Sequence, residues 1–154
     1  MAKIYLASSW RNPWQPTIVT LLRDSGHEVY DFRNPGPGSH GFAWHEVDEK
    51  WRGWTLEQYR DALKDPIAEA GFRADMDGLE WCDTCILAQP CGTSSHLELG
   101  WACGQRKRTA VLFPGDDIEP AWRDAPLRSF EPELMPKMVD AILIGKTELL
   151  SWLG

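Results

Sequence analysis

The segment at residues 84–89, TCILAQ, constrains the fold most, because its four central side chains are all apolar. A strand that is apolar on both sides belongs in a sheet whose two faces are covered, which is typical of parallel sheets packed between helices. Three other segments are predicted as strands, at residues 3–7, 27–32 and 109–113. Helical segments separate these strands. The alternation predicts an α/β fold with a parallel sheet.

Helices are expected between and after the strands, at residues 16–24, 55–63, 66–81, 95–105 and from 131 onward with a break near Gly145. Residues 127–130, LRSF, are expected to add a short fifth strand. In open parallel sheets the ligand lies at the carboxyl ends of the strands. The loops at 8–14, 33–42 and 90–95 are therefore the expected ligand-binding loops.

The composition is that of an ordinary globular protein. The chain has 154 residues, 43% of them hydrophobic, and a formal net charge of −7. This length predicts a single domain, residues 1–154, and the negative charge disfavours binding to nucleic acid polymers. No apolar run reaches the roughly 18 residues of a membrane span, and the first residues lack the pattern of a secretory signal. We therefore expect a cytoplasmic protein.

Cys82 and Cys85 form a Cys-x-x-Cys pair, and the other cysteines are Cys91 and Cys103. Such a pair can bind zinc or act in redox chemistry. A redox pair normally opens a helix, whose dipole lowers the thiol pKa, whereas this pair closes a predicted helix and enters a strand. His96 is the one histidine nearby in the sequence, and a Cys-x-x-Cys pair with a single histidine offers too few ligands for a typical zinc site. We expect buried, reduced thiols, with no metal and no cofactor.

The segment at residues 42–54 is dense in tryptophan. Four of its apolar side chains fall close to helical spacing: Trp44, Val47, Trp51 and Trp54. One interpretation is an amphipathic helix packed on the core. The other is a mobile aromatic lid that stacks on a planar ligand, with Trp44 and His45 as the candidate contacts.

Asp75 is the first of two carboxylates with an unusual position. It falls at the edge of an apolar helical stripe formed by Phe72, Met76 and Leu79. An acid on an apolar face is costly unless it is paired or functional. Asp75 is therefore either a structural hydrogen-bonding residue or a functional acid.

Glu98 is the second carboxylate. The run Ser95-His96-Leu97-Glu98 fits a capping box, in which the Ser95 hydroxyl accepts from the Glu98 amide and the carboxylate accepts from the Ser95 amide. This interpretation needs no chemistry. The alternative is catalytic, because amides at a helix start keep a carboxylate ionised and ready to act as a nucleophile. The pattern alone leaves both interpretations open.

Three blocks of the sequence resemble the nucleoside 2-deoxyribosyltransferases and the related 2'-deoxynucleoside 5'-monophosphate N-glycosidases. KIYLASSW is similar to the family's first strand and loop, ADMDGLEWCDTCILA to its acid-bearing helix and central strand, and GTSSHLELGWACGQRKRTAVLF to its glutamate signature and the next strand. The resemblance implies a flavodoxin-like parallel sheet of about five strands flanked by helices. It also implies a homo-oligomer in which subunits share active sites, acting on a small deoxynucleoside or deoxynucleotide and a free base.

The resemblance implies roles for individual residues. Glu98 matches the family's nucleophile, Asp75 its acid beside the leaving base, and Tyr5 a tyrosine that orients the glutamate. Trp10 matches a loop aromatic beside the substrate. The expected substrate contacts are Ser8, Ser9, Trp10, Arg11, Trp44, Gly92, Thr93 and Ser94.

The implied reaction breaks the N-glycosidic bond of a 2'-deoxynucleoside. Glu98 would attack C1' to form a covalent deoxyribosyl-enzyme while Asp75 protonates or hydrogen bonds the departing base. A second base would then take the sugar. This is the two-carboxylate mechanism of retaining glycosidases. It needs one ionised acid and one that is more easily protonated.

Position 92 departs from the transferase pattern. Many transferases carry an acid six residues before the nucleophile to hold sugar hydroxyls, and here that residue is Gly92. The hydroxyl groups of residues 93–95, together with Arg11, fit a 5'-phosphate, although Arg11 could equally be a solvated charge. The alternative function is therefore hydrolysis of 2'-deoxynucleoside 5'-monophosphates, with water taking the sugar. A non-catalytic nucleotide-binding module is the other alternative.

Overall fold

A computed structural model of the chain describes residues 1–119 and 133–154. The chain divides into two compact units. The first comprises Met1–Tyr30 and Cys82–Gly154, and it contains the sheet. The second is Asp31–Trp81. Among the helices of the described ranges, none combines the length and apolar character that crossing a bilayer requires.

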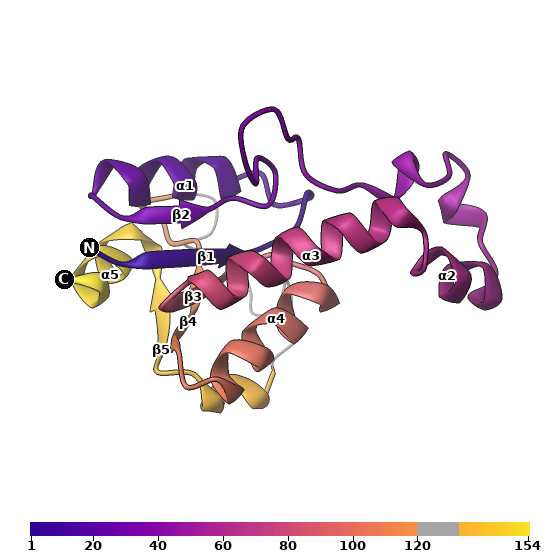
Figure 1. Cartoon of the computed structure of the whole chain (residues 1–154). Helices are drawn as coiled ribbons and strands as arrows, with labels where there is room; N and C mark the ends of the chain where they lie inside the picture. The colour runs from indigo at the N-terminus through magenta and orange to yellow at the C-terminus, as the bar shows by residue number, and fades with distance from the viewer. Residues whose placement is uncertain (120–132) are drawn as a thin grey trace. The chain divides into compact units, whose positions relative to one another are not determined.

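The first unit is built on a parallel five-stranded sheet with the strand order β2-β1-β3-β4-β5. All neighbouring strands run parallel (Figure 1). The strands are β1 (Lys3–Ala7), β2 (Glu28–Tyr30), β3 (Thr84–Ala88), β4 (Arg108–Phe113) and β5 (Ala141–Ile144). The predicted α/β fold with a parallel sheet is confirmed, and β3 lies at the centre of the sheet.

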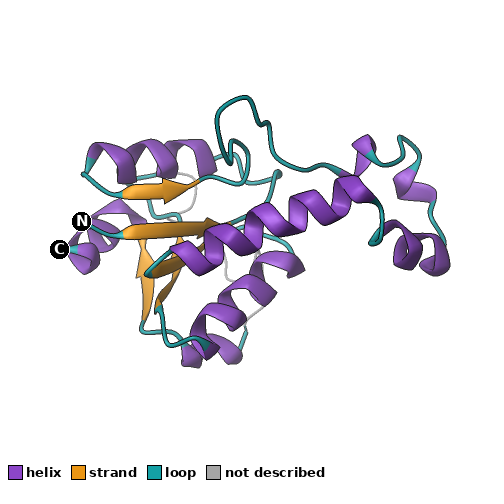
Figure 2. Cartoon of the chain, viewed as in Figure 1, coloured by secondary structure: helices purple, strands orange, loops and turns teal. Residues whose placement is uncertain are grey.

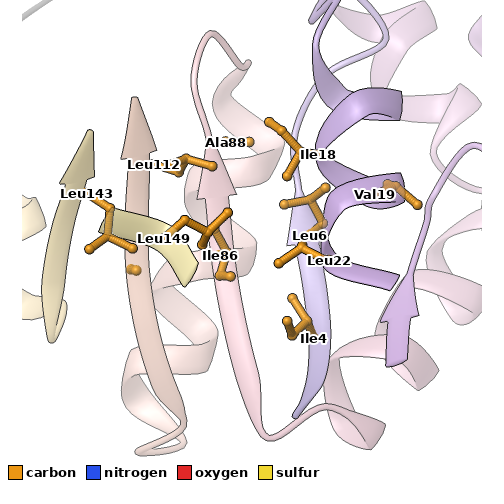
Figure 3. Packing of buried hydrophobic residues seen from close by; sticks show 11 residues of the cluster. Ile4, Leu6, Ile18, Val19, Leu22, Ile86, Ala88, Leu112, Leu143 and Leu149 are labelled. Atoms are coloured by element: carbon orange, nitrogen blue, oxygen red, sulfur yellow. The ribbon is translucent and has the colours of Figure 1, made fainter. Parts of the chain in front are cut away.

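Helices α1 (Gln15–Asp24) and α5 (Gly145–Leu153) cover one face of this sheet. The core there consists of Ile4, Leu6, Ile86, Ala88, Ala110, Leu112 and Leu143 from the strands, Ile18, Val19 and Leu22 from α1, and Leu149 from α5 (Figure 3). Because side chains alternate along a strand, the residues between these positions face the other side. Helix α4 (Thr93–Gly104) packs on that second face through β1, β3 and β4.

Asp117 fixes the start of α5 to the segment that follows β4. Its carboxylate accepts from the amides of Lys146 and Thr147 at 2.9 and 3.0 Å and from the Thr147 hydroxyl at 2.9 Å. Burial alone would raise the pKa of Asp117, but these hydrogen bonds lower it overall. Gly145 is required beside it, since its φ is +77° and an added Cβ would lie 2.1 Å from Asp117 Oδ1.

The second unit contains α2 (Leu56–Ala62), the long helix α3 (Pro66–Trp81) and two short 3-10 turns, η1 (Trp44–Glu46) and η2 (Trp51–Gly53). The tryptophan-rich segment is therefore not one amphipathic helix (Figure 2). Its rings pack on one another instead. Trp44 makes edge contacts with Phe42, Trp54 and Tyr59 at centroid distances of 4.8, 5.5 and 6.1 Å.

Gly71 of α3 makes room for Phe42 in the second unit. A Cβ built on Gly71 would lie 2.8 Å from the Cβ of Phe42. This contact holds the loop that precedes η1 against α3. Glycine is unfavourable inside a helix, so the close approach of the phenylalanine is the physical reason for its presence here.

The end of the chain differs from the prediction. Residues 141–144, AILI, form β5 rather than part of a helix, and η5 (Met135–Met138) precedes them. A four-residue apolar run cannot be assigned by periodicity, and pairing with β4 decides its conformation. The other candidate for the fifth strand, residues 127–130, lies outside the described residues.

Candidate active site

The loops after β1 and β3 lie side by side at the carboxyl edge of the sheet. The last residue of β1, Ala7, is the register partner of Leu87 in β3. The chain then enters the loop at 8–14 from β1 and the loop at 89–92 from β3. Two of the three predicted ligand-binding loops are thus neighbours. The third, at 33–42, belongs to the second unit.

Asn12 joins these two loops, although the sequence did not single it out. It is fully buried, and its Nδ2 donates to Ser8 Oγ at 3.0 Å and to the carbonyls of Ala88 and Gln89 at 3.2 Å each. Its Oδ1 accepts from the Trp14 amide at 2.9 Å. Asn12 therefore fixes the ends of β1 and β3 and the entry into α1 with one side chain.

Ser95 does not form the predicted capping box. Helix α4 begins two residues earlier, at Thr93, with Gly92 as its N-cap residue and no side-chain cap. The Ser95 hydroxyl, 2% exposed, donates instead to Ser8 O at 2.7 Å. The prediction failed because a partner 87 residues away in the sequence takes the hydroxyl. The structural explanation for Glu98 fails with it.

The uncapped start of α4 leaves backbone amides available. The first N–H groups of a helix have no acceptor within the helix, and the side chains of Thr93 and Ser94 are exposed. Arg11 approaches this point, since a Cβ added to Gly92 would lie 3.9 Å from Arg11 Nη2. A helix start beside a guanidinium favours an anion.

Glu98 lies within α4, half-buried, on the side of the helix that carries the buried residues Ser95 and Ala102. Burial raises the pKa of Cys85 in β3, and the nearby charges of Cys82 and Glu98 add to the effect. Burial also raises the pKa of Cys91 to about 12, with contributions from Glu133 and Glu98. The Glu98 carboxylate therefore lies within electrostatic range of β3 and of the loop that follows it.

Tyr5 shares the face of the sheet that α4 covers. It is the register partner of Cys85, so the two side chains point to the same side. Its ring is 1% exposed and stacks on Tyr30 at a centroid distance of 5.0 Å and an interplanar angle of 9°. Tyr5 and Glu98 thus occupy the same layer of the first unit.

The other predicted contacts are dispersed. Ser8 donates its hydroxyl to Ala88 O at 3.0 Å, and Ser9 Oγ accepts from the Arg11 amide at 3.2 Å. Trp10 is 48% exposed in the same loop. Ser8 is thus a structural member of the Asn12 network, whereas Trp10 and Arg11 remain open to solvent.

Asp75 and Trp44 belong to the second unit. Asp75 lies half-buried in α3, and Trp44 lies in η1 within its aromatic cluster. His45, which follows Trp44, is exposed. In the first unit, Cys82 and Cys85 are buried and form no disulfide, as expected, while Cys91 and Cys103 are half-buried and likewise outside any disulfide.

No family model matches the sequence, and no curated protein matches it either. Among solved structures, the chain is similar to the CMP N-glycosidase of Clostridium botulinum, with 17% identity over 97% of this chain and 96% of that chain and a TM-score of 0.51. A 2-deoxyribosyltransferase of Bacillus psychrosaccharolyticus shows 20% identity over 90% of this chain and 96% of that chain, with a TM-score of 0.46. The chain therefore has the fold of the CMP N-glycosidase, and the family resemblance in its sequence is supported at the level of the fold.

Proposed function

We propose that this protein is an enzyme that cleaves the N-glycosidic bond of a 2'-deoxynucleoside or its 5'-monophosphate, with Glu98 as the nucleophile. The observation that carries this proposal is the start of α4 at Thr93. Because Ser95 bonds to Ser8 and not to the helix start, the capping box no longer accounts for Glu98. Glu98 lies half-buried on the side of α4 that carries the buried residues Ser95 and Ala102, within electrostatic range of β3 and of the loop that follows it.

The reaction proceeds in two steps. The Glu98 carboxylate attacks C1' of the sugar, and the bond from C1' to the base nitrogen breaks as Asp75 donates a proton or hydrogen bond to the base. Water, or a second base, then displaces Glu98 from C1'. Tyr5 lies in the same layer as Glu98 and is held by its stacking on Tyr30, which suits a residue that orients the nucleophile.

The surroundings of Gly92 favour a substrate with a 5'-phosphate. Arg11 and the free amides of the first turn of α4 meet there, and the combination of cation and helix dipole suits a phosphate. Gly92 also provides no carboxylate to hold sugar hydroxyls as in many transferases. Hydrolysis of a 5'-monophosphate is therefore the preferred form of the proposal. The likeness in fold to a CMP N-glycosidase supports it, and transfer to a second base shares its first step.

The test is product analysis with a panel of 2'-deoxynucleosides and their 5'-monophosphates, each with and without a second free base. Release of base and sugar phosphate from the monophosphates alone identifies a nucleotide hydrolase. A new nucleoside carrying the added base identifies a transferase. Intact substrate after long incubation, together with tight binding, would show a binding module instead.

Glu98→Gln tests the nucleophile. Glutamine keeps the shape of the side chain and removes the attacking oxygen anion, so we expect a loss of rate on the order of a thousandfold or more. Glu57→Gln, at an exposed position in the first turn of α2, is the matched control and should keep the wild-type rate. An unchanged rate in the folded Glu98→Gln protein would refute the proposed mechanism.

A further inference from the structure

The segment that ends in the outermost strand, β5, carries large apolar side chains that are open to solvent. Five of them are between 49% and 74% exposed: Leu134, Met135, Met138, Ile142 and Ile144. We call this set the edge patch. Side chains of this size and exposure present several hundred Å² of apolar surface. The largest apolar patch on a typical monomer is about 300–600 Å² and is often functional.

Strand β5 directs two of these side chains to the face of the sheet that carries α4. Leu143 belongs to the core beneath α1 and α5, and side chains alternate along a strand. Ile142 and Ile144 therefore point to the opposite face. Helix α4 packs on β1, β3 and β4, whereas β5 packs mainly against β4 and α5. The helical layer on this face thus ends at β4, and the two isoleucines lie beyond it.

The methionines of the edge patch come from η5, which leads into β5 (Figure 1). Side chains three residues apart eclipse one another in a 3-10 helix, so Met135 and Met138 lie on one side of η5. Glu133, just before η5, lies beside α4, because its Oε1 is 2.7 Å from Nε2 of His96. The segment therefore starts next to the last helix of the layer and ends in the strand that the layer leaves open.

The charges of this segment balance. Residues 133–146 include two acids, Glu133 and Asp140, and two bases, Lys137 and Lys146. The whole chain carries a formal charge of −7, so two copies repel one another through their overall field. A neutral segment adds little to that repulsion, and its opposite charges can pair across an interface. A membrane surface would instead favour an excess of lysine and arginine around the apolar residues.

We propose that the edge patch is the contact surface of a homodimer, in which it packs against the same patch of a second copy. Two-fold symmetry is the commonest form of homo-oligomer, and it requires a surface that is complementary to itself. An apolar centre that contains methionine, with charges of both signs around it, meets this requirement. The exposed apolar area of the patch supplies much of the roughly 800 Å² that each partner contributes to a standard interface.

Sedimentation of the whole chain over a range of concentrations tests the proposal. The wild-type protein should form dimers at micromolar concentrations. Leu134→Glu and Met138→Glu each bring a charge into the apolar contact from both copies, so we expect the dissociation constant to rise about a hundredfold or more. Leu56→Glu is the matched control, because this leucine is 83% exposed and lies in α2, outside the edge patch. It should leave the dissociation constant within about twofold of wild type.

Circular dichroism shows whether each variant is folded. Hydrogen exchange of the wild-type protein supplies a readout that needs no variant. As the concentration rises through the dissociation constant, the amides of residues 134–144 should become more protected, and those of α2 should not.

Two results would overturn the proposal. One is a wild-type protein that stays monomeric at every concentration. The other is an oligomer that is as stable in Leu134→Glu and Met138→Glu as in Leu56→Glu, because another surface would then hold it together. Neither result depends on catalysis, so the proposed function and the proposed interface fail independently.

Discussion

Replacing Asn12 by aspartate should destabilise the fold by removing the donor that joins two loops. The side chain keeps its size, but an oxygen takes the place of Nδ2. That atom donates to Ser8 Oγ and to the carbonyls of Ala88 and Gln89. A carboxylate would face three oxygen atoms in a fully buried position. The Asn12→Asp carboxyl should therefore stay protonated in the folded state.

The magnitude follows from the two protonation states. Leaving one buried hydrogen-bonding group without its partner costs about 1–3 kcal/mol. Asn12→Ala leaves two such groups, the Gln89 carbonyl and the Trp14 amide. It should therefore lower the free energy of unfolding by roughly 2–6 kcal/mol. In Asn12→Asp the folded-state pKa of the new carboxyl is raised above the unfolded value. Its folded state binds more protons, so stability falls as pH rises, by about 1.4 kcal/mol per pH unit between the two pKa values.

Urea unfolding followed by circular dichroism at several pH values between 4 and 8 measures both effects. We expect Asn12→Asp to approach the stability of Asn12→Ala near pH 4 and to fall well below it near pH 7. Ser94→Ala, at an exposed position in the first turn of α4, is the control and should change stability by less than about 0.5 kcal/mol. A pH-independent difference between Asn12→Asp and wild type would refute the reasoning about the buried carboxyl.

Three further predictions concern other sites. Asp117→Ala should lower the free energy of unfolding by about 1 kcal/mol, because the start of α5 loses its cap. Hydrogen bonds lower the pKa of Asp117 in the folded state, so its contribution to stability is present above the unfolded pKa and is lost as the pH falls through the folded pKa. Unfolding measured at a series of acid pH values tests this. Gly71→Ala should lower the free energy of unfolding by about 1–3 kcal/mol through overpacking, since the new Cβ would lie 2.8 Å from the Cβ of Phe42. A thermal melt tests this. Cys91, with its pKa raised to about 12, should react with iodoacetamide at pH 8 roughly a thousandfold more slowly than free cysteine. Glu133→Gln should speed that reaction by removing a nearby negative charge.

The sequence predicted the elements whose signals are local. The strands at β1 and β3 and the helix Pro66–Trp81 match their predicted bounds within a residue, because continuous apolar runs and a proline at a helix start act over short distances. The strand β5 was missed for the opposite reason. Its four residues carry no periodicity of their own, and only pairing with β4 makes them a strand.

The candidate site shows the same limit more sharply. Asn12 could have been noticed as an Asn-Pro pair after a strand, which is a turn signal. Its partners Ala88 and Gln89 are 76 and 77 residues away, however, so no local pattern shows that it joins two loops. Ser95 fits a capping box perfectly in sequence, and a carbonyl contributed by another loop outcompetes the helix for its hydroxyl.

The alternative use of Ser95 has a consequence for the chemistry. A capped helix start would satisfy its own amides and hold Glu98 against them. In this fold the serine instead ties α4 to the end of β1, and α4 begins at a glycine with no side-chain cap. A glycine at the N-cap, in place of a side chain that caps the helix, forgoes only about a few tenths of a kcal/mol, so the fold can leave this helix start without a side-chain cap at little cost. Because the Ser95 hydroxyl bonds to Ser8 and not to the start of its own helix, the first amides of α4 stay open to an anion and Glu98 has no role in a cap. These are the two features that the proposed reaction needs.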